Sequence, residues 1–145
     1  MTTTEKMQKA APVVLRIGLA LVFLWFGFAQ LLHTSMWLGL IPKWVTGMSG
    51  LQAVTLVHFN GAFEIVFGIC LLFGFFTRVV TLLFALHMIH IALTLVAASG
   101  LTAISVRDLG LSFAAVTLFL LGPGAQYCSV DNWLCTRFEQ KKVQM

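Results

Sequence analysis

The chain has 145 residues, of which 59% are hydrophobic and only 10% are charged. A soluble domain carries about 25% charged residues, so this composition excludes an ordinary soluble domain and indicates that lipid solvates much of the surface. The net charge of +4 comes from Lys and Arg at the chain ends and segment junctions, without interleaved aromatic residues, and therefore does not indicate nucleic-acid binding.

Four apolar segments follow one another along the chain. They predict membrane-spanning helices at about 13–32, 51–75, 79–98 and 104–122, followed by a tail at 123–145. The first three reach the ~20 residues that cross a hydrocarbon core of ~30 Å. The fourth, whose apolar part is 109–121, does so only when its start is moved back toward residue 101 or its end past residue 122. We expect the first segment to be a retained helix, since it is longer than the ~7–15 apolar residues of a signal peptide. The whole chain, 1–145, is interpreted as a single membrane domain.

The breaks between these segments carry residues that favour turns or interfaces. Residues 33–50 contain Pro42 together with Trp37 and Trp44, and tryptophan prefers the headgroup region. Thr77 and Arg78 form a short turn between the second and third segments. The run 122–124 (Gly-Pro-Gly) stops the fourth, because proline cannot continue a helix.

The basic residues predict the orientation. One side of the membrane would carry seven, and the other only Lys43 and Arg107; the seven are Lys6, Lys9, Arg16, Arg78, Arg137, Lys141 and Lys142. The positive-inside rule then places both chain ends in the cytosol. Short turns favour antiparallel neighbours, so we predict an all-α, up-down-up-down bundle in a bacterial-type cytoplasmic (inner) membrane.

Ionisable residues within the apolar segments are candidates for function, because burying them in a bilayer is costly. Glu64 and His58 lie in the second segment, His87 and His90 in the third, and Asp108 near the start of the fourth. At ~1.5 Å rise per residue, Glu64 and His87 fall at similar depths and predict a polar seam between the second and third helices. Asn60 shares a helix face with Glu64, and Arg107 adjoins Asp108.

Three uses fit such a seam: proton transfer, binding of a quinone head group, or binding of a metal. We assign proton handling to Glu64, His87 and His90, since histidine titrates near neutral pH. Binding of a quinone or another polar ligand is assigned to four residues: His58, Asn60, Arg107 and Asp108. A metal or haem is disfavoured, because only one histidine pair has the i, i+3 spacing of bundle metal sites.

Each of these residues also has a structural interpretation. Glu64 could fix the register of two helices by hydrogen bonding, and His58 could simply pack at an interface. Asp108 favours a helix N-terminus through the macrodipole. Arg16 is either an anchor that extends to the headgroups or a partner of Asp131.

The cysteines do not indicate a disulfide scaffold. Cys70 is interpreted as a small apolar residue within the second helix. Cys128 and Cys135 follow the fourth helix on the predicted cytosolic side, where structural disulfides are rare, so we favour free thiols.

Several stretches together resemble the DoxX family of small four-helix membrane proteins. In chain order they are Arg16-x-Gly18, 22–27, 61–68 around Glu64, 71–78 ending in Arg78, Arg107-Asp108-Leu109, 122–124 and 129–131. The resemblance covers roughly residues 12–133. Two places depart from the family pattern: Gln30 stands near a usual lysine, and residues 125–128 intervene before the Ser-x-Asp sequence.

The resemblance implies a functionally mixed family, with members linked to thiosulfate–quinone oxidoreduction, to oxidative and thiol stress, or to assembly and trafficking. It also implies that Glu64, Arg78, Arg107 and Asp108 are features of the family. Our first hypothesis is a redox-linked, quinone-facing or proton-handling subunit that works with a partner oxidoreductase, because the sequence contains no recognisable flavin, nicotinamide or iron–sulfur motif. The second is a non-catalytic assembly or scaffold subunit, and a homo-oligomer is compatible with either. A transporter is less favoured, because no broken helix or inverted repeat is evident.

Overall fold

The protein is described by a computed structural model that covers residues 2–122 and 130–131. Helices occur in the order α1 (Thr3–Leu32), η1 (Thr34–Met36), η2 (Leu38–Leu40), α2 (Lys43–Ser49), α3 (Ala53–Phe73), α4 (Thr77–Ser99) and α5 (Ala103–Leu121), without strands in the described residues. Four of them, α1, α3, α4 and α5, are long and apolar enough to cross a membrane. The predicted all-α fold with four spanning helices is therefore confirmed, whereas the orientation of the termini remains a prediction.

The helix ends follow from local capping. α1 begins as early as Thr3 because Thr2 and Glu5 form a capping box, in which each side chain accepts a hydrogen bond from the other residue's backbone N–H. Its polar first turns then run directly into the apolar segment. Thr102 and Ser105 form the same arrangement at the start of α5. The connector predicted at the interface is not extended but contains η1, η2 and the short helix α2.

The turn between α3 and α4 is held by two left-handed residues and by the tail. Gly74 (φ 72°) ends α3, and Phe76 (φ 47°) precedes α4. The carboxylate of Asp131 accepts hydrogen bonds from the backbone N–H of Phe76 (2.8 Å) and of Thr77 (2.7 Å), while its own N–H donates to the Gly74 carbonyl (3.1 Å). A carboxylate at a helix N-terminus satisfies otherwise orphaned donors, so Asp131 caps α4.

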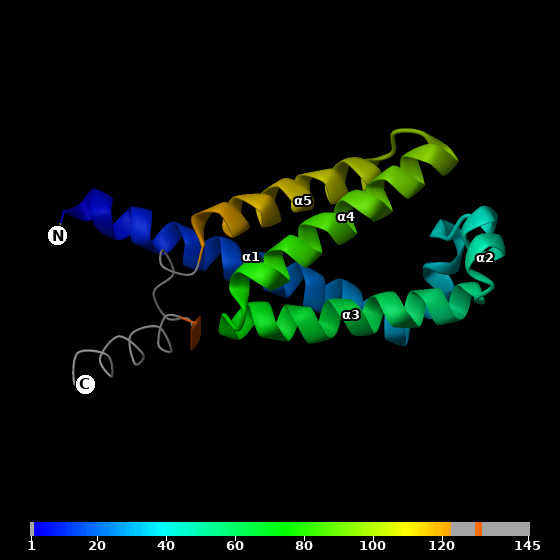
Figure 1. The fold of residues 1–145 in the computed structure, drawn as a ribbon, viewed down its shortest axis with the longest axis horizontal. Helices are drawn as coiled ribbons and strands as arrows, with labels where there is room; N and C mark the ends of the chain where they lie inside the picture. The colour runs from blue at the N-terminus through cyan, green and yellow to red at the C-terminus, as the bar shows by residue number, and fades with distance from the viewer. Residues whose placement is uncertain (1, 123–129, 132–145) are drawn as a thin grey trace, which may run out of the picture.

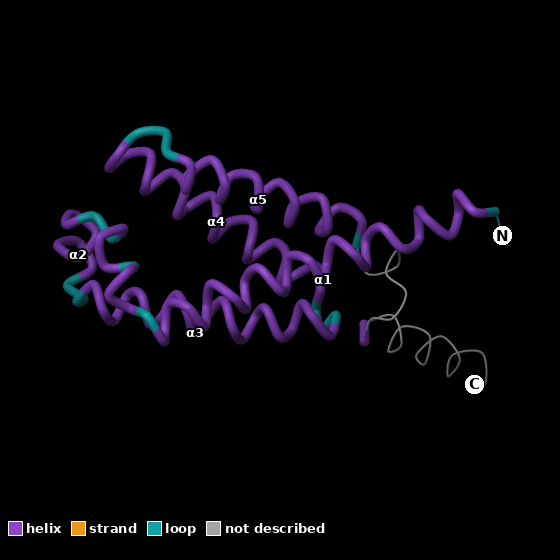
Figure 2. Tube along the Cα trace, turned by 180° about the vertical axis from the view of Figure 1, so that it is seen from behind, coloured by secondary structure: helices purple, strands orange, loops and turns teal. Residues whose placement is uncertain are grey.

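The spanning helices pack as two antiparallel pairs, α1 with α3 and α4 with α5 (Figure 1). The pairs meet near the α3–α4 turn and diverge toward α2, as the view from behind also shows (Figure 2). We call these two ends of the bundle the turn end and the connector end. The expectation that sequential helices are packed neighbours holds within each pair but is wrong for α3 and α4, which contact each other only slightly because they diverge from their shared turn.

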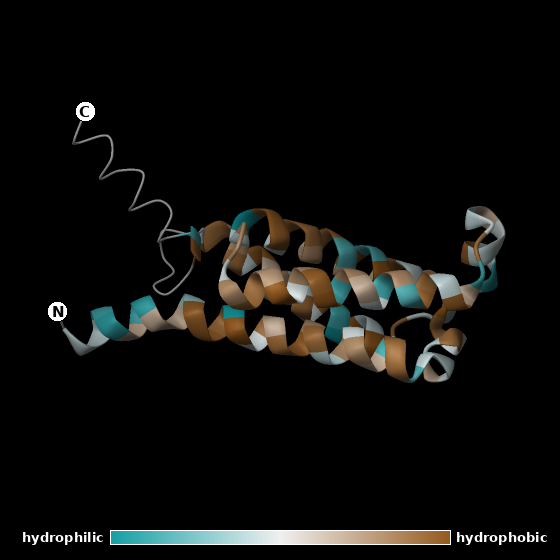
Figure 3. Ribbon diagram, turned by 90° about the horizontal axis from the view of Figure 1, so that it is seen from below, coloured by the Kyte–Doolittle hydropathy of each residue, from teal (hydrophilic) through white to brown (hydrophobic). Residues whose placement is uncertain are grey.

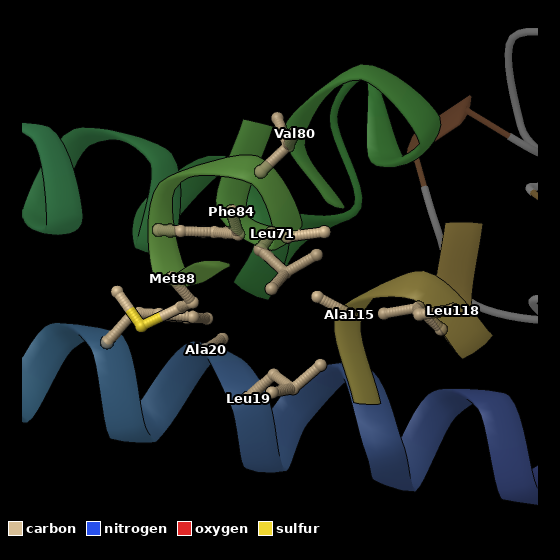
Figure 4. Close-up of a cluster of buried hydrophobic side chains, with 10 residues drawn as sticks. Leu19, Ala20, Leu71, Val80, Phe84, Met88, Ala115 and Leu118 are labelled. Atoms are coloured by element: carbon tan, nitrogen blue, oxygen red, sulfur yellow. The ribbon is translucent and has the colours of Figure 1, made fainter. Parts of the chain in front are cut away.

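The apolar core occupies the half of the bundle at the turn end. All four spanning helices contribute to it, and Figure 4 shows their side chains converging: Leu19, Ala20, Leu71, Val80, Phe84, Met88, Ala115 and Leu118. The rings of Phe23 and Phe84 stack across the α1–α4 contact, with centroids 3.7 Å apart and planes within 3°. Several hydrophilic segments lie in the half of the bundle away from the marked termini (Figure 3).

Arg16 is a buried charged residue in the half of the bundle at the turn end. Only 2% of its surface is exposed, so it does not extend to the headgroups as an exposed anchor. The other interpretation, in which Arg16 is a partner of Asp131, stays a prediction; the Asp131 carboxylate also caps α4, as described above.

Candidate ligand cavity

A cavity of about 520 Å³ fills the half of the bundle at the connector end. Its walls come from both helix pairs and from the connector, and it is mostly apolar, with aromatic side chains that include Phe23, Phe26, Trp37, Trp44 and Phe59. Six of the seven predicted site residues line it: Asn60, Glu64, His87, His90, Arg107 and Asp108. Pockets of 300–1,000 Å³ with a few polar groups in an apolar lining are typical of small-molecule sites.

A closed hydrogen-bonded cluster forms the polar wall on α1 and α3. Gln30 Nε2 donates to Glu64 Oε2 (2.8 Å), while Asn60 Nδ2 donates both to Glu64 Oε1 (3.1 Å) and to Gln30 Oε1 (2.6 Å). Gln30 and Glu64 are each only 3% exposed. Glu64 therefore hydrogen-bonds to α1. The polar seam predicted between Glu64 on α3 and His87 on α4 is replaced by this α1–α3 cluster, because α4 diverges from α3 at this level.

Two glycines allow α1 and α3 to approach closely enough for this cluster. A Cβ on Gly27 would lie 2.8 Å from the carbonyl oxygen of Gly61, and a Cβ on Gly61 would lie 2.9 Å from the carbonyl oxygen of Gly27. Small residues at such contacts are a common means of helix packing in membranes. Gly27 and Gln30 are one turn apart, as are Gly61 and Glu64, so the close contact lies beside the polar cluster.

An ion pair occupies the α5 wall. Arg107 donates to Asp108 Oδ1 through Nε (2.8 Å) and through its terminal nitrogen (2.7 Å). The Arg107 guanidinium also lies over the ring of Phe26, 4.5 Å from its centroid. The Asp108 side chain is 4% exposed and that of Arg107 is 39% exposed, and both residues line the cavity.

The histidines occupy different positions. His87 and His90, one turn apart on α4, line the cavity. The His87 ring packs against Phe63 with centroids 4.5 Å apart, and its Nε2 is buried without a hydrogen bond in the described structure. His58 does not line the cavity; it is exposed and interacts with Thr34 Oγ1 (2.9 Å) in the connector. Among the described residues, no group of three or more His, Cys, Asp or Glu residues is placed to hold a metal ion.

Comparison with known proteins identifies the family. The DoxX family profile matches residues 11–98, more than half of the chain. The chain belongs to the DoxX family. Neither the curated proteins nor the solved structures contain a significant match.

The DoxX match spans α1 to α4, which supply Gln30, Asn60, Glu64, His87 and His90. The Arg107–Asp108 pair on α5 lies beyond it. Together with four apolar spanning helices, membership of this family establishes a multi-pass membrane protein in contact with lipid.

Gln30 is the site residue that the sequence interpretation missed. In the sequence Gln30 stands out only as a departure from the family's usual lysine, yet in the structure it is the α1 partner of the Glu64 carboxylate. Its signal in the sequence is a polar amide at the end of an apolar run, one turn after Gly27. The aromatic residues of the connector were assigned to the membrane interface, and Trp37 and Trp44 in addition line the cavity. Cys128 and Cys135 lie outside the described residues.

Proposed function

We propose that this DoxX-family protein is a redox-linked subunit of a bacterial-type cytoplasmic membrane, and that its cavity binds the head group of a lipid-soluble quinone. The observation that carries the proposal is the cavity itself: an aromatic-rich space of about 520 Å³ within a membrane bundle, with the Gln30–Asn60–Glu64 cluster on one wall. A quinone ring is flat and apolar with polar oxygens, and these surroundings match both of its properties.

The cluster has hydrogen-bonding capacity left for such a ligand. Both N–H groups of the Asn60 amide and one N–H of Gln30 are committed within the cluster. The second N–H of Gln30 and the Oδ1 of Asn60 remain available. A quinone carbonyl accepts a hydrogen bond, whereas a quinol hydroxyl also donates one. Gln30 suits the oxidised form and Asn60 suits the reduced form, so the same wall accommodates both.

Electrons would come from a partner. The sequence contains no recognisable motif for flavin, nicotinamide or iron–sulfur binding, and the proposed role of this chain is to hold the quinone and to supply hydrogen-bonding groups. The Arg107–Asp108 pair adds a charged group on the opposite helix pair. A membrane-associated oxidoreductase would deliver the electrons.

Tryptophan fluorescence provides a direct test. Trp37 and Trp44 line the cavity, whereas Trp25 is 74% exposed on α1. Menadione, a short quinone, should quench the purified protein in mild detergent saturably, and a Trp37→Phe/Trp44→Phe variant should lose the saturable component. Unsaturable quenching that is unchanged in this variant would contradict quinone binding in the cavity.

A matched pair of charge-removing variants refines the test. Glu64→Gln replaces one carboxylate oxygen with an amide nitrogen that faces a donor, and a buried donor left unsatisfied costs about 1–3 kcal/mol. We expect it to weaken menadione quenching by disturbing Gln30 and Asn60. Glu5→Gln makes the same chemical change at the exposed start of α1 and should leave quenching unchanged.

A non-catalytic scaffold role is the second candidate, and one observation favours it. The same cluster joins α1 to α3 beside the Gly27–Gly61 contact, as a purely structural element would. A quinone-free protein that co-purifies with a stable partner and shows no saturable menadione quenching would support this role.

A further inference from the structure

The structure divides the bundle into an open half and a sealed half, and the polar groups of the cavity lie on one side of that division. On α1, α3, α4 and α5 the cavity is lined by 23–30, 56–64, 87–95 and 104–111, which are the parts of each helix toward the connector end. The core cluster takes the complementary parts toward the turn end. Phe23 and Met88 belong to both sets and mark the boundary.

The boundary is closed by tightly packed apolar side chains. Phe23 is 1% exposed and stacks on Phe84, which is fully buried, at a centroid distance of 3.7 Å. Beyond this pair, Leu71 and Leu118 are also fully buried. Protein interiors packed in this way exclude water-sized voids. Within the described residues, no lining residue of the cavity lies on the turn-end side of Phe23 along α1.

Two hydroxyl groups of the sealed half hydrogen-bond within their own helices. Thr81 donates to the Thr77 carbonyl oxygen (2.7 Å), and Ser112 donates to the Leu109 carbonyl oxygen (2.7 Å). Each hydroxyl is thus committed to its own helix. Two further contacts close the turn end. Asp131 caps α4, and the Arg78 guanidinium lies so close to Gly122 that an added Cβ there would be 2.7 Å from it.

We propose that the cavity is a blind vestibule that exchanges water, protons and polar ligand groups with the connector side of the membrane only, which is the side opposite the N-terminus. His90 is exposed at the cavity, and Thr94 and Ser49 also line it toward the connector. These residues provide the hydrated route to Glu64 and Asn60.

For a quinone site, the proposal also states from which side of the membrane protons reach the bound quinone, and this part rests on the proposed function. Reduction of a bound quinone to quinol takes up electrons from the partner oxidoreductase and an equal number of protons. Those protons would enter from the connector side, and oxidation of quinol would release them there. With the predicted orientation, that side is the outside of the cell.

Accessibility of single cysteines tests the sidedness without any quinone. In a background with the three native cysteines replaced by alanine, Leu101→Cys (75% exposed, between α4 and α5) and Met7→Cys (68% exposed, α1) report the connector side and the N-terminal side, and neither residue lines the cavity. A membrane-impermeant, negatively charged methanethiosulfonate is applied to either face of sealed vesicles. Thr94→Cys should react only from the face that labels Leu101→Cys.

The sealed half supplies the matched control. Thr81→Cys and Ser112→Cys exchange small buried side chains for one of similar size and should remain unlabelled from both faces. Reaction of Thr94→Cys from the N-terminal face, or from neither face, would overturn the proposal, as would labelling of both sealed-half cysteines from the N-terminal face. Size-exclusion chromatography of each variant establishes that it is folded.

Menadione separates this proposal from the proposed function. If bound quinone occupies the cavity, it should slow the labelling of Thr94→Cys. One-sided labelling that menadione does not slow would refute the quinone assignment and support the blind vestibule. Labelling from both faces that menadione does slow would refute the blind vestibule and support the quinone assignment.

Discussion

The close contact between α1 and α3 makes a quantitative prediction for Gly61→Ala. The added Cβ would lie 2.9 Å from the carbonyl oxygen of Gly27, 3.1 Å from Gln30 Cβ and 3.2 Å from Leu31 Cδ2. The first of these atoms belongs to the backbone and cannot rotate away. The two helices must therefore separate by a few tenths of an ångström, and the hydrogen bond from Gln30 to Glu64, now 2.8 Å, must lengthen.

The expected cost follows from two opposing effects. Overpacking of a close contact costs about 1–3 kcal/mol, whereas replacing glycine by alanine within a helix stabilises it by up to about 1 kcal/mol. The middle of the first range, about 2 kcal/mol, less the full gain of about 1 kcal/mol leaves an expected net loss of about 1 kcal/mol for Gly61→Ala. Gly68→Ala should be milder, because its nearest neighbours are side-chain atoms of Leu24 at 3.1 Å, which can shift.

Two other helical glycines provide the matched controls. A Cβ on Gly18 in α1 or on Gly110 in α5 meets nothing within 4 Å, so alanine there should leave stability unchanged or raise it. Thermal unfolding in mild detergent, followed by tryptophan fluorescence, measures the series. The reasoning is refuted if Gly61→Ala unfolds at the same temperature as Gly18→Ala, because the two variants would then differ in contacts but not in stability.

Three further predictions concern the polar contacts. Removing the cap with Asp131→Ala should destabilise the start of α4 by about 1 kcal/mol, seen as faster amide exchange in its first turn. Arg107→Ala leaves the buried Asp108 carboxylate without its donor and should lower the free energy of unfolding by about 1–3 kcal/mol. In a double-mutant cycle, adding Asp108→Asn to this variant should restore part of that free energy. If the losses of the two single variants simply add, the two residues do not interact. His58→Phe should not change menadione quenching, since His58 lies outside the cavity; a clear loss of quenching would place it in the site.

The spanning helices, and which of their polar residues lie at the same level along the bundle, could be predicted from the amino-acid sequence. Hydropathy and segment length indicate a membrane helix directly, because the bilayer sets both. The rise per residue then placed Glu64 and His87 at similar levels, and both line the same cavity. Asp108 is predicted as an ionisable residue near an apolar segment, Asn60 because it shares a helix face with Glu64, and Arg107 because it adjoins Asp108; all three line the cavity.

The neighbours of each helix could not be predicted in the same way. In a soluble helix the apolar stripe marks the buried face, but a membrane helix is apolar toward lipid and toward protein alike. Hydropathy therefore does not show which neighbouring helix the Glu64 side chain faces. The assumption that adjacent segments pack together leads to the wrong choice, α4. The better signal was Gly61, one turn before Glu64, together with Gly27, one turn before Gln30, because a face made of small residues is the face that approaches another helix.

The division of the bundle into two halves connects these observations. Where α1 and α3 approach through glycine, the shared cluster satisfies the polar groups of Gln30, Asn60 and Glu64 without any contribution from α4. The α4–α5 pair can consequently diverge at the connector end, and the space that opens is the cavity. At the turn end large side chains such as Phe84 fill the space between the pairs. The open half with its polar cluster follows from where the glycines and the polar residues lie along α1 and α3, and the sealed half follows from the large apolar side chains at the turn end. The one-sided access proposed for the cavity depends on both.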